Sequence, residues 1–148
     1  MREIRFRAKT VKGSQWIEGD LFHAGTEPSD GEFAISYWDE DSGWMYENVR
    51  PDTIGQLTGV KDKSGTDIYE GDIVECVSWN EYFSDGSGKP LEPFRRRMYV
   101  GFRKGGFKMV EPMPEPLKDR EWDIIYNGDI EIVGNIHDNP ELLKRKSI

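Results

Sequence analysis

The chain has 148 residues and a net charge of −8 at neutral pH, and 36% of its residues are hydrophobic. This length is typical of one domain, because domains cluster near roughly 100–150 residues. No apolar run approaches the ~20 residues that a membrane helix requires, and the basic N-terminus lacks the apolar core of a signal peptide. The single cysteine excludes an intrachain disulfide and a cysteine-rich zinc site. We therefore expect one domain, residues 1–148, located in the cytoplasm without a membrane partner.

The negative charge is concentrated in the first half of the chain. Residues 1–75 carry 8 Lys/Arg against 16 Asp/Glu, whereas residues 76–148 carry 12 of each. Non-specific affinity for nucleic acids comes mainly from neutralised phosphates, so this balance disfavours a nucleic-acid partner.

The composition predicts a mainly β protein. Ile and Val number 20, Ala and Leu only 9, and 12% of the residues are aromatic. β-branched and aromatic side chains fit a pleated sheet, whereas helical proteins are rich in Ala and Leu. The first strands are indicated by alternation of apolar and polar residues; they cover residues 3–9, 16–22, 33–38 and 44–49, the last two forming a hairpin.

The pattern in the middle of the chain predicts a tight hairpin, then a turn, and then a further strand. Asp62 and Gly65 are typical of the turn between strands 57–61 and 66–69. Gly71 and Asp72 then lead into strand 73–78. A Gly-Asp-apolar-Val entry of this kind is common in small SH3-like barrels, so we expect a partial barrel over residues 55–136.

The last third of the chain predicts two more hairpins and one helix. The first hairpin pairs strands 97–102 and 107–110, and the second joins strands 122–126 and 130–136 through Asn127-Gly128, a strong hairpin signal. A proline-rich linker, residues 111–116, separates them. Asn139 as the cap and Pro140 at the first position predict a short C-terminal helix. An α+β fold is the alternative.

One short pattern occurs three times. An apolar residue, any residue, Gly, Asp and an apolar residue follow one another at 17–21, 69–73 and 126–130. We interpret each glycine as a turn or bulge residue with positive φ. The match is too short to indicate duplication.

The residues offer no compelling catalytic or metal site. Cys76 lies in an apolar strand, where a buried structural role is favoured over a nucleophile. His23 and His137 lack metal-ligand spacing, and the acidic turn at residues 39–41 fits an EF-hand loop poorly. We expect no cofactor and no metal.

The only basic cluster is short. It comprises Arg95, Arg96 and Arg97, with Arg103 nearby. A solvated strand flank is favoured over a phosphate-binding patch, so these four arginines are weak candidates for a binding site.

Two long motifs carry a resemblance to a known family. Residues 53–74 include the Asp62-Lys-Ser-Gly65 turn and Gly71-Asp72, and residues 133–143 read Val-Gly134-Asn135-Ile-His-Asp-Asn139-Pro140-Glu-Leu-Leu. Together with residues 4–8 and 16–21 they resemble the YopX family over nearly the whole chain. The resemblance implies a protein of bacteriophages and prophages without an established biochemical activity, and a homo-oligomer, such as a trimer. His137 departs from the family's usual Tyr, which argues against a catalytic His137.

The sequence thus leads to three hypotheses about function. The first is a non-catalytic phage accessory protein of a bacterial host, acting through contacts with host or phage proteins or through self-assembly. The alternatives are a nucleic-acid-binding module that uses Arg95–Arg97 and nearby aromatics, and a hydrolase that uses buried carboxylates. Self-association is expected because aromatic residues flank predicted loops, among them Trp38, Trp44, Trp79 and Tyr82. The domain divides into an N-terminal β segment, residues 1–50, and a barrel-like core with the helix, residues 53–143.

Overall fold

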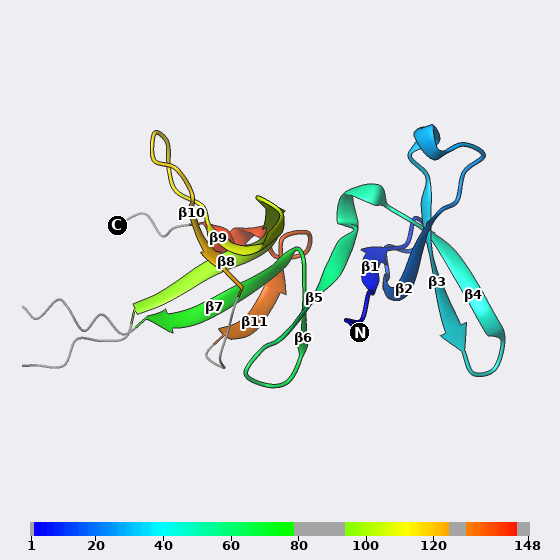
Figure 1. Ribbon diagram of the computed structural model, residues 1–148, viewed down its shortest axis with the longest axis horizontal. Helices are drawn as coiled ribbons and strands as arrows, with labels where there is room; N and C mark the ends of the chain where they lie inside the picture. Colours follow the sequence, from blue (N-terminus) through cyan, green and yellow to red (C-terminus); the bar gives the residue numbers. More distant parts are fainter. Residues whose placement is uncertain (1, 79–93, 125–129, 145–148) are drawn as a thin grey trace, which may run out of the picture. The chain divides into compact units, whose positions relative to one another are not determined.

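The computed structural model describes residues 2–78, 94–124 and 130–144. These residues form eleven strands and three short 3-10 turns, with no α-helix among them, so the mainly β prediction is confirmed (Figure 1). The chain divides into two compact units, Met1–Gly59 and Val60–Ile148. Within the described ranges, no helix has the length and apolar character needed to cross a membrane.

Unit 1 is an antiparallel sheet with the strand order β4-β3-β2-β1-β5. Its strands are β1 (Phe6–Lys9), β2 (Trp16–His23), β3 (Phe33–Asp39), β4 (Gly43–Val49) and the first part of β5 (Gly55–Lys61). Two 3-10 turns, η1 (Pro28–Asp30) and η2 (Pro51–Thr53), lie in its connections. The end of β4 also meets the residues after β1, because Thr10 and Val49 form an antiparallel bridge.

The core of unit 1 lies on one face of this sheet. Ala8, Ile35 and Val49 are buried there, and five half-buried side chains pack against them: Phe6, Ile17, Leu21, Phe33 and Ile54. The expected alternation of apolar and polar positions supplies this face, since neighbouring residues of a strand point to opposite sides.

Unit 2 contains the end of β5, which turns into β6 (Asp67–Tyr69), and a five-stranded antiparallel sheet with the order β10-β9-β8-β7-β11. The strands of that sheet are β7 (Asp72–Ser78), β8 (Phe94–Arg103), β9 (Gly106–Glu111), β10 (Arg120–Asp123) and β11 (Ile130–Asn135). A third 3-10 turn, η3 (Pro140–Leu143), packs on β8.

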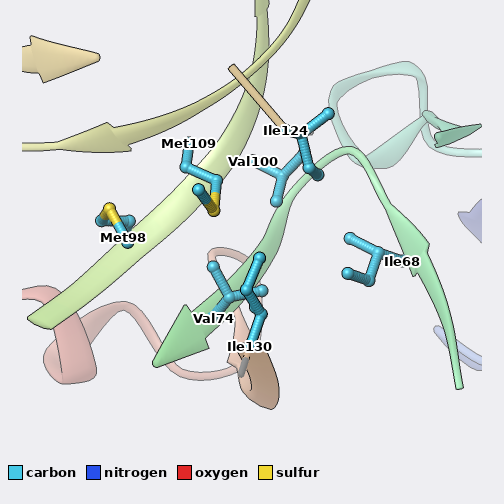
Figure 2. Packing of buried hydrophobic residues seen from close by; sticks show 7 residues of the cluster. All are labelled: Ile68, Val74, Met98, Val100, Met109, Ile124 and Ile130. Carbon is cyan, nitrogen blue, oxygen red and sulfur yellow. The ribbon is translucent and has the colours of Figure 1, made fainter. Parts of the chain in front are cut away.

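Seven buried side chains make the core of unit 2. Figure 2 shows them, and they come from five strands and from the residue after β10: Ile68, Val74, Met98, Val100, Met109, Ile124 and Ile130. Fully burying an aliphatic side chain contributes about 1.5–3 kcal/mol, so this cluster is the main source of stability in the unit.

Asp62 fastens the β5–β6 turn to a strand 70 residues later in the chain. Its Oδ1 accepts hydrogen bonds from the amides of Ser64 (2.9 Å) and Thr66 (3.0 Å). Its Oδ2 accepts one from the amide of Ile132 in β11 (3.2 Å). The expected turn role is confirmed, and the contact with β11 extends it.

Gly71 and Asp72 fasten the entry to β7 in a similar way. Gly71 has φ of 93°, as the sequence predicted, and a side chain is strained in this left-handed region. The Gly71 amide donates to Val100 (2.7 Å), and its carbonyl accepts from Ile136 (2.9 Å). The buried Asp72 carboxylate accepts from the amide of Tyr69 (2.8 Å). Gly65 also has positive φ, at 82°.

The barrel-like core expected over residues 55–136 does not close into a barrel in the described residues. The strands divide between two sheets, and no closed barrel was detected in the part of the chain that the structure describes. The hairpin predicted for strands 122–126 and 130–136 is wrong, because β10 and β11 lie at opposite edges of the five-stranded sheet. β10 pairs with β9 instead, where Lys108 bonds Asp123 across the strands. Asn127-Gly128 lies outside the described residues.

The C-terminal helix is a single 3-10 turn in the described residues. Pro140 stands at its first position as predicted, but the Asn139 side chain accepts no capping hydrogen bond from the backbone of the turn. The Asn139 Oδ1 accepts from the amide of Asn135 instead (3.3 Å). Gly134 makes this turn possible, since a Cβ there would lie 2.6 Å from Asn139 Oδ1 and 2.9 Å from Leu142 Cδ1. Neither the α-helix nor the alternative α+β fold is therefore present in the described chain.

The three Gly-Asp repeats do not share one conformation. Gly71 has positive φ, whereas Gly19 lies inside β2 without it. Gly19 is required for another reason, because a Cβ there would lie 2.0 Å from the carbonyl oxygen of Ser36 on the next strand. The third repeat extends into residues outside the described ranges.

We predict that Asp62→Asn lowers the free energy of unfolding by about 1–3 kcal/mol at pH 7, because the new amide N–H₂ would face the Ile132 amide. Burial acts to raise the pKa of Asp62, but the three backbone donors outweigh it and lower the pKa below 3.8. Because the pKa is lower in the native state, the charged carboxylate contributes its full stability at pH values above the pKa of the unfolded chain. The difference between parent and variant should therefore be complete at pH 6–7 and shrink below about pH 4.

Urea unfolding at several pH values measures this difference. The matched control is Asp123→Asn in the same unit, whose carboxylate is exposed and whose loss should cost less than about 1 kcal/mol. Equal losses for the two variants would show that Asp62 does not hold the turn to β11.

Candidate protein-binding surface

The strands β2, β3 and β4 direct alternate side chains to the two faces of the unit 1 sheet. The register pairs Trp38 with Trp44 and Ser36 with Tyr46, and it places Phe22 opposite Ala34. These positions lie on the face opposite the core, whereas Ile35 and Val49 point into the core. Besides Trp16 next to β1, the sheet therefore carries four large aromatic side chains on its solvent side.

We call Phe22, Trp38, Trp44 and Tyr46 the aromatic face. Trp38 is 60% exposed, Trp44 67%, Tyr46 66% and Phe22 39%. The rings form two edge-to-face pairs, Trp38–Trp44 with centroids 5.5 Å apart and Phe22–Tyr46 with centroids 6.0 Å apart. Such pairs favour a defined ring geometry, and the patch thus presents neighbouring aromatic rings to solvent.

A groove lies at the tryptophan end of the aromatic face. It has a volume of about 370 Å³, and Trp38 and Trp44 line it together with Asp20, Glu18 and Arg5. Arg5 forms ion pairs with Glu3 and, at 3.6 Å, with Glu18. A smaller hollow of about 280 Å³ adjoins Tyr46 and includes Lys12.

Carboxylates outnumber cations on the wall of the groove, where Glu3, Glu18 and Asp20 lie with Arg5. Residues 13–49, which contain all of β2, β3 and β4, carry nine Asp/Glu and no Lys or Arg. Further cations on this face come from β1, where Arg7 and Lys9 lie over the ring of Trp16, at 4.9 Å and 5.6 Å from its centroid. The surface thus combines aromatic rings with negative charge.

The arginines that the sequence singled out do not form one patch. In β8, Arg95 and Arg97 both bind Glu75, at 2.9 Å and 3.0 Å. Arg96 points to the other face, where its guanidinium lies 3.5 Å from Glu111 and 5.4 Å from the Trp122 ring centroid. The hydrogen bond from Arg97, with a further one from Arg95, lowers the pKa of Glu75 and keeps it charged.

Arg103 is also engaged within unit 2. It donates to Glu121 (3.0 Å) and to the hydroxyl of Tyr99 (2.7 Å), and it lies 3.6 Å from Asp119. The hydrogen bond to Glu121 raises the pKa of Arg103 and lowers that of Glu121. A hollow of about 750 Å³ opens beside these residues, with Lys104, Leu117 and Lys118 also on its wall. Its charges of both signs already neutralise one another.

The remaining candidates have structural roles. Asp39 accepts hydrogen bonds from the amides of Asp41 (2.9 Å) and Ser42 (3.0 Å), so it shapes its turn. His23 is exposed beside Phe33, and the His137 amide donates to Asn135 (3.0 Å). Across residues 2–78, 94–124 and 130–144, no three His, Cys, Asp or Glu side chains gather into a metal site.

Sequence reasoning missed the aromatic face as a unit. It named Trp38 and Trp44 as residues that flank the acidic turn but did not place them beside Tyr46 and Phe22. The signal was present in the alternation of β3, where Ile35 and Trp38 occupy positions of opposite parity. Trp79 and Tyr82, which the sequence also placed near a loop, lie outside the described residues.

We predict that Cys76 reacts slowly with a thiol reagent in the native protein. The side chain is half-buried, less than the sequence predicted, and packs against the core of unit 2. Its burial raises the pKa of the thiol, so less thiolate is present at neutral pH. The rate of modification by a maleimide, compared with that in denaturant, measures this. Native and denatured rates that agree would restore Cys76 as a candidate nucleophile.

The structure is similar to a solved structure from Enterococcus faecalis. The crystal structure of protein EF1440 from Enterococcus faecalis matches with a TM-score of 0.53 and 22% sequence identity, over 97% of this chain and 100% of that chain. This likeness concerns the fold alone.

The chain matches a family model but no curated protein. No curated protein matches this chain. The family model described as "YopX protein" matches residues 5–144, the range that holds both long sequence motifs. The chain therefore belongs to the YopX family.

Proposed function

We propose that this YopX-family protein is a non-catalytic accessory protein of a bacteriophage or prophage. It acts in the cytoplasm of a bacterial host by contacting other proteins. The observation that carries the proposal is the aromatic face, where three of the four rings are at least 60% exposed. Contiguous exposed aromatic patches mark protein interfaces, because their burial against a partner removes large apolar areas from water.

The two alternative functions have less support. Arg95, Arg97 and Arg103 are bound to carboxylates of the same unit, which reduces the charge available to a nucleic acid. The buried carboxylates Asp62 and Asp72 accept backbone hydrogen bonds, which suits a structural role better than that of a general base.

Self-assembly is one form of the proposed contact. The exposed rings supply apolar area for it, and the family resemblance implies a homo-oligomer such as a trimer. A protein partner from the host or the phage is the other form. Both require the aromatic face to be buried in the complex, so one experiment addresses them together.

The test is affinity capture from bacteria that carry the phage, with a second, differently tagged copy of the chain present. Three baits are compared: the parent, a Trp38→Ala/Trp44→Ala double variant, and Phe102→Ala. Phe102 is a matched control, since it is 56% exposed and pairs edge-to-face with Phe107 in unit 2.

A protein recovered with the parent and with Phe102→Ala should be reduced about tenfold with the double variant, as expected when an interface loses aromatic anchors. Recovery of the second tagged copy would identify self-assembly. Equal recovery by all three baits would contradict the proposal.

A further inference from the structure

We infer that the aromatic face binds an arginine-bearing segment of a partner protein, with a guanidinium on the tryptophan rings and against the carboxylates of the groove. This inference rests on the proposed function and adds the chemistry of the partner. Three observations carry it: the aromatic rings, the excess of carboxylates on the wall of the groove, and the way that β1 already meets the same face of the sheet.

Beside β1, the chain itself contains the kind of interaction proposed for the partner: cations that lie over an aromatic ring next to a carboxylate. Arg7 and Lys9 stand over Trp16, and Arg5 binds Glu18, the residue that follows Trp16 by two positions on the same strand. Cation, ring and carboxylate are therefore combined along β1 and β2. A cation over an aromatic ring contributes about 0.5–2 kcal/mol, and more when water is excluded.

On the β3–β4 side the rings and acids lie in the groove, where Arg5 already pairs with Glu3 and Glu18 and Asp20 is the further carboxylate. Trp38 and Trp44 line the groove with Asp20 and Glu18, and residues 13–49 contain no Lys or Arg. A partner's cation placed there would complete the arrangement seen beside β1.

The charge also argues against a second copy of this face as the occupant. Two such grooves would bring together two linings in which Glu3, Glu18 and Asp20 outnumber Arg5, and like charges at an interface oppose association. A cationic segment would instead be attracted, since complementary charge speeds the encounter of two proteins and fixes the register of their binding.

Arginine fits the groove better than lysine does. A guanidinium is planar, so it can stack on an indole ring while its N–H groups bind a carboxylate in a bidentate manner. The groove presents both surfaces within about 370 Å³: the indoles of Trp38 and Trp44, and the carboxylate of Asp20.

The test uses the full chain and synthetic peptides in isothermal titration calorimetry. The probe is a nine-residue Gly/Ser peptide with arginine at three alternate positions. Two companion peptides carry citrulline, which keeps the planar shape without the charge, or lysine at the same positions. A fourth peptide carries glutamate.

We expect the arginine peptide to bind and the affinity to fall as NaCl rises from 50 to 300 mM. The citrulline and glutamate peptides should bind at least about tenfold more weakly, and the lysine peptide should be intermediate. Trp38→Ala/Trp44→Ala and, separately, Asp20→Asn should each weaken the arginine peptide about tenfold. Phe102→Ala and Asp52→Asn, which change exposed residues elsewhere, should bind as the parent does.

Several results would overturn the inference. They are equal binding of the arginine and citrulline peptides, binding that Asp20→Asn leaves unchanged, and no binding of any peptide. If no peptide binds but the capture experiment still depends on Trp38 and Trp44, the partner is not cationic and the proposed function stands. Asp20→Asn keeps the test valid if the tryptophan variant fails to fold.

Discussion

The alternation of side chains along antiparallel strands is the constraint on which unit 1 depends. Ile35 and Val49 must lie in the core, and residues of odd and even position point to opposite faces. Trp38, Trp44 and Tyr46 are therefore directed to solvent by the same register that buries their neighbours. A shift by one residue would exchange the two faces and lose the core. The exposure of these rings therefore follows from the same strand pairing that forms the core.

Unit 2 depends on polar anchors that connect distant parts of the chain. Asp62 joins a local turn to β11, and Lys63 strengthens this joint because its amide donates to the carbonyl of Ile130 (2.9 Å). Gly71 holds β8 through its amide and Ile136 through its carbonyl. These bonds lie around the apolar cluster of Figure 2 and bring its contributing strands together. The arginines of β8 likewise form ion pairs with carboxylates of unit 2, and these ion pairs support the fold.

The sequence predicted the features that depend on neighbouring residues. It did not predict those that depend on pairing between segments far apart in the chain. The strands, the Asp62 turn and the positive φ of Gly71 follow from alternation and turn residues alone. The Asn127-Gly128 hairpin was wrong because β10 finds β9 as its partner, with Lys108 and Asp123 bonded across the strands. The helix was wrong because the Asn139 side chain bonds the Asn135 amide and does not cap a helix. The arginine site could not be assessed from sequence, since Glu75 and Glu111 meet those side chains only across the sheet. The aromatic face was accessible in principle, but only to reasoning that combined three strands.

The central claim is that the aromatic face is the place where this protein contacts its partner. Hydroxyl-radical footprinting with mass spectrometry tests it most directly, on the full chain alone and on the complex isolated from its host. The account predicts that Trp38, Trp44 and Tyr46 are oxidised readily in the free chain and protected in the complex. Phe102, exposed in unit 2, should react equally in both. Oxidation of the three residues at the same rate in the complex as in the free chain would contradict the account.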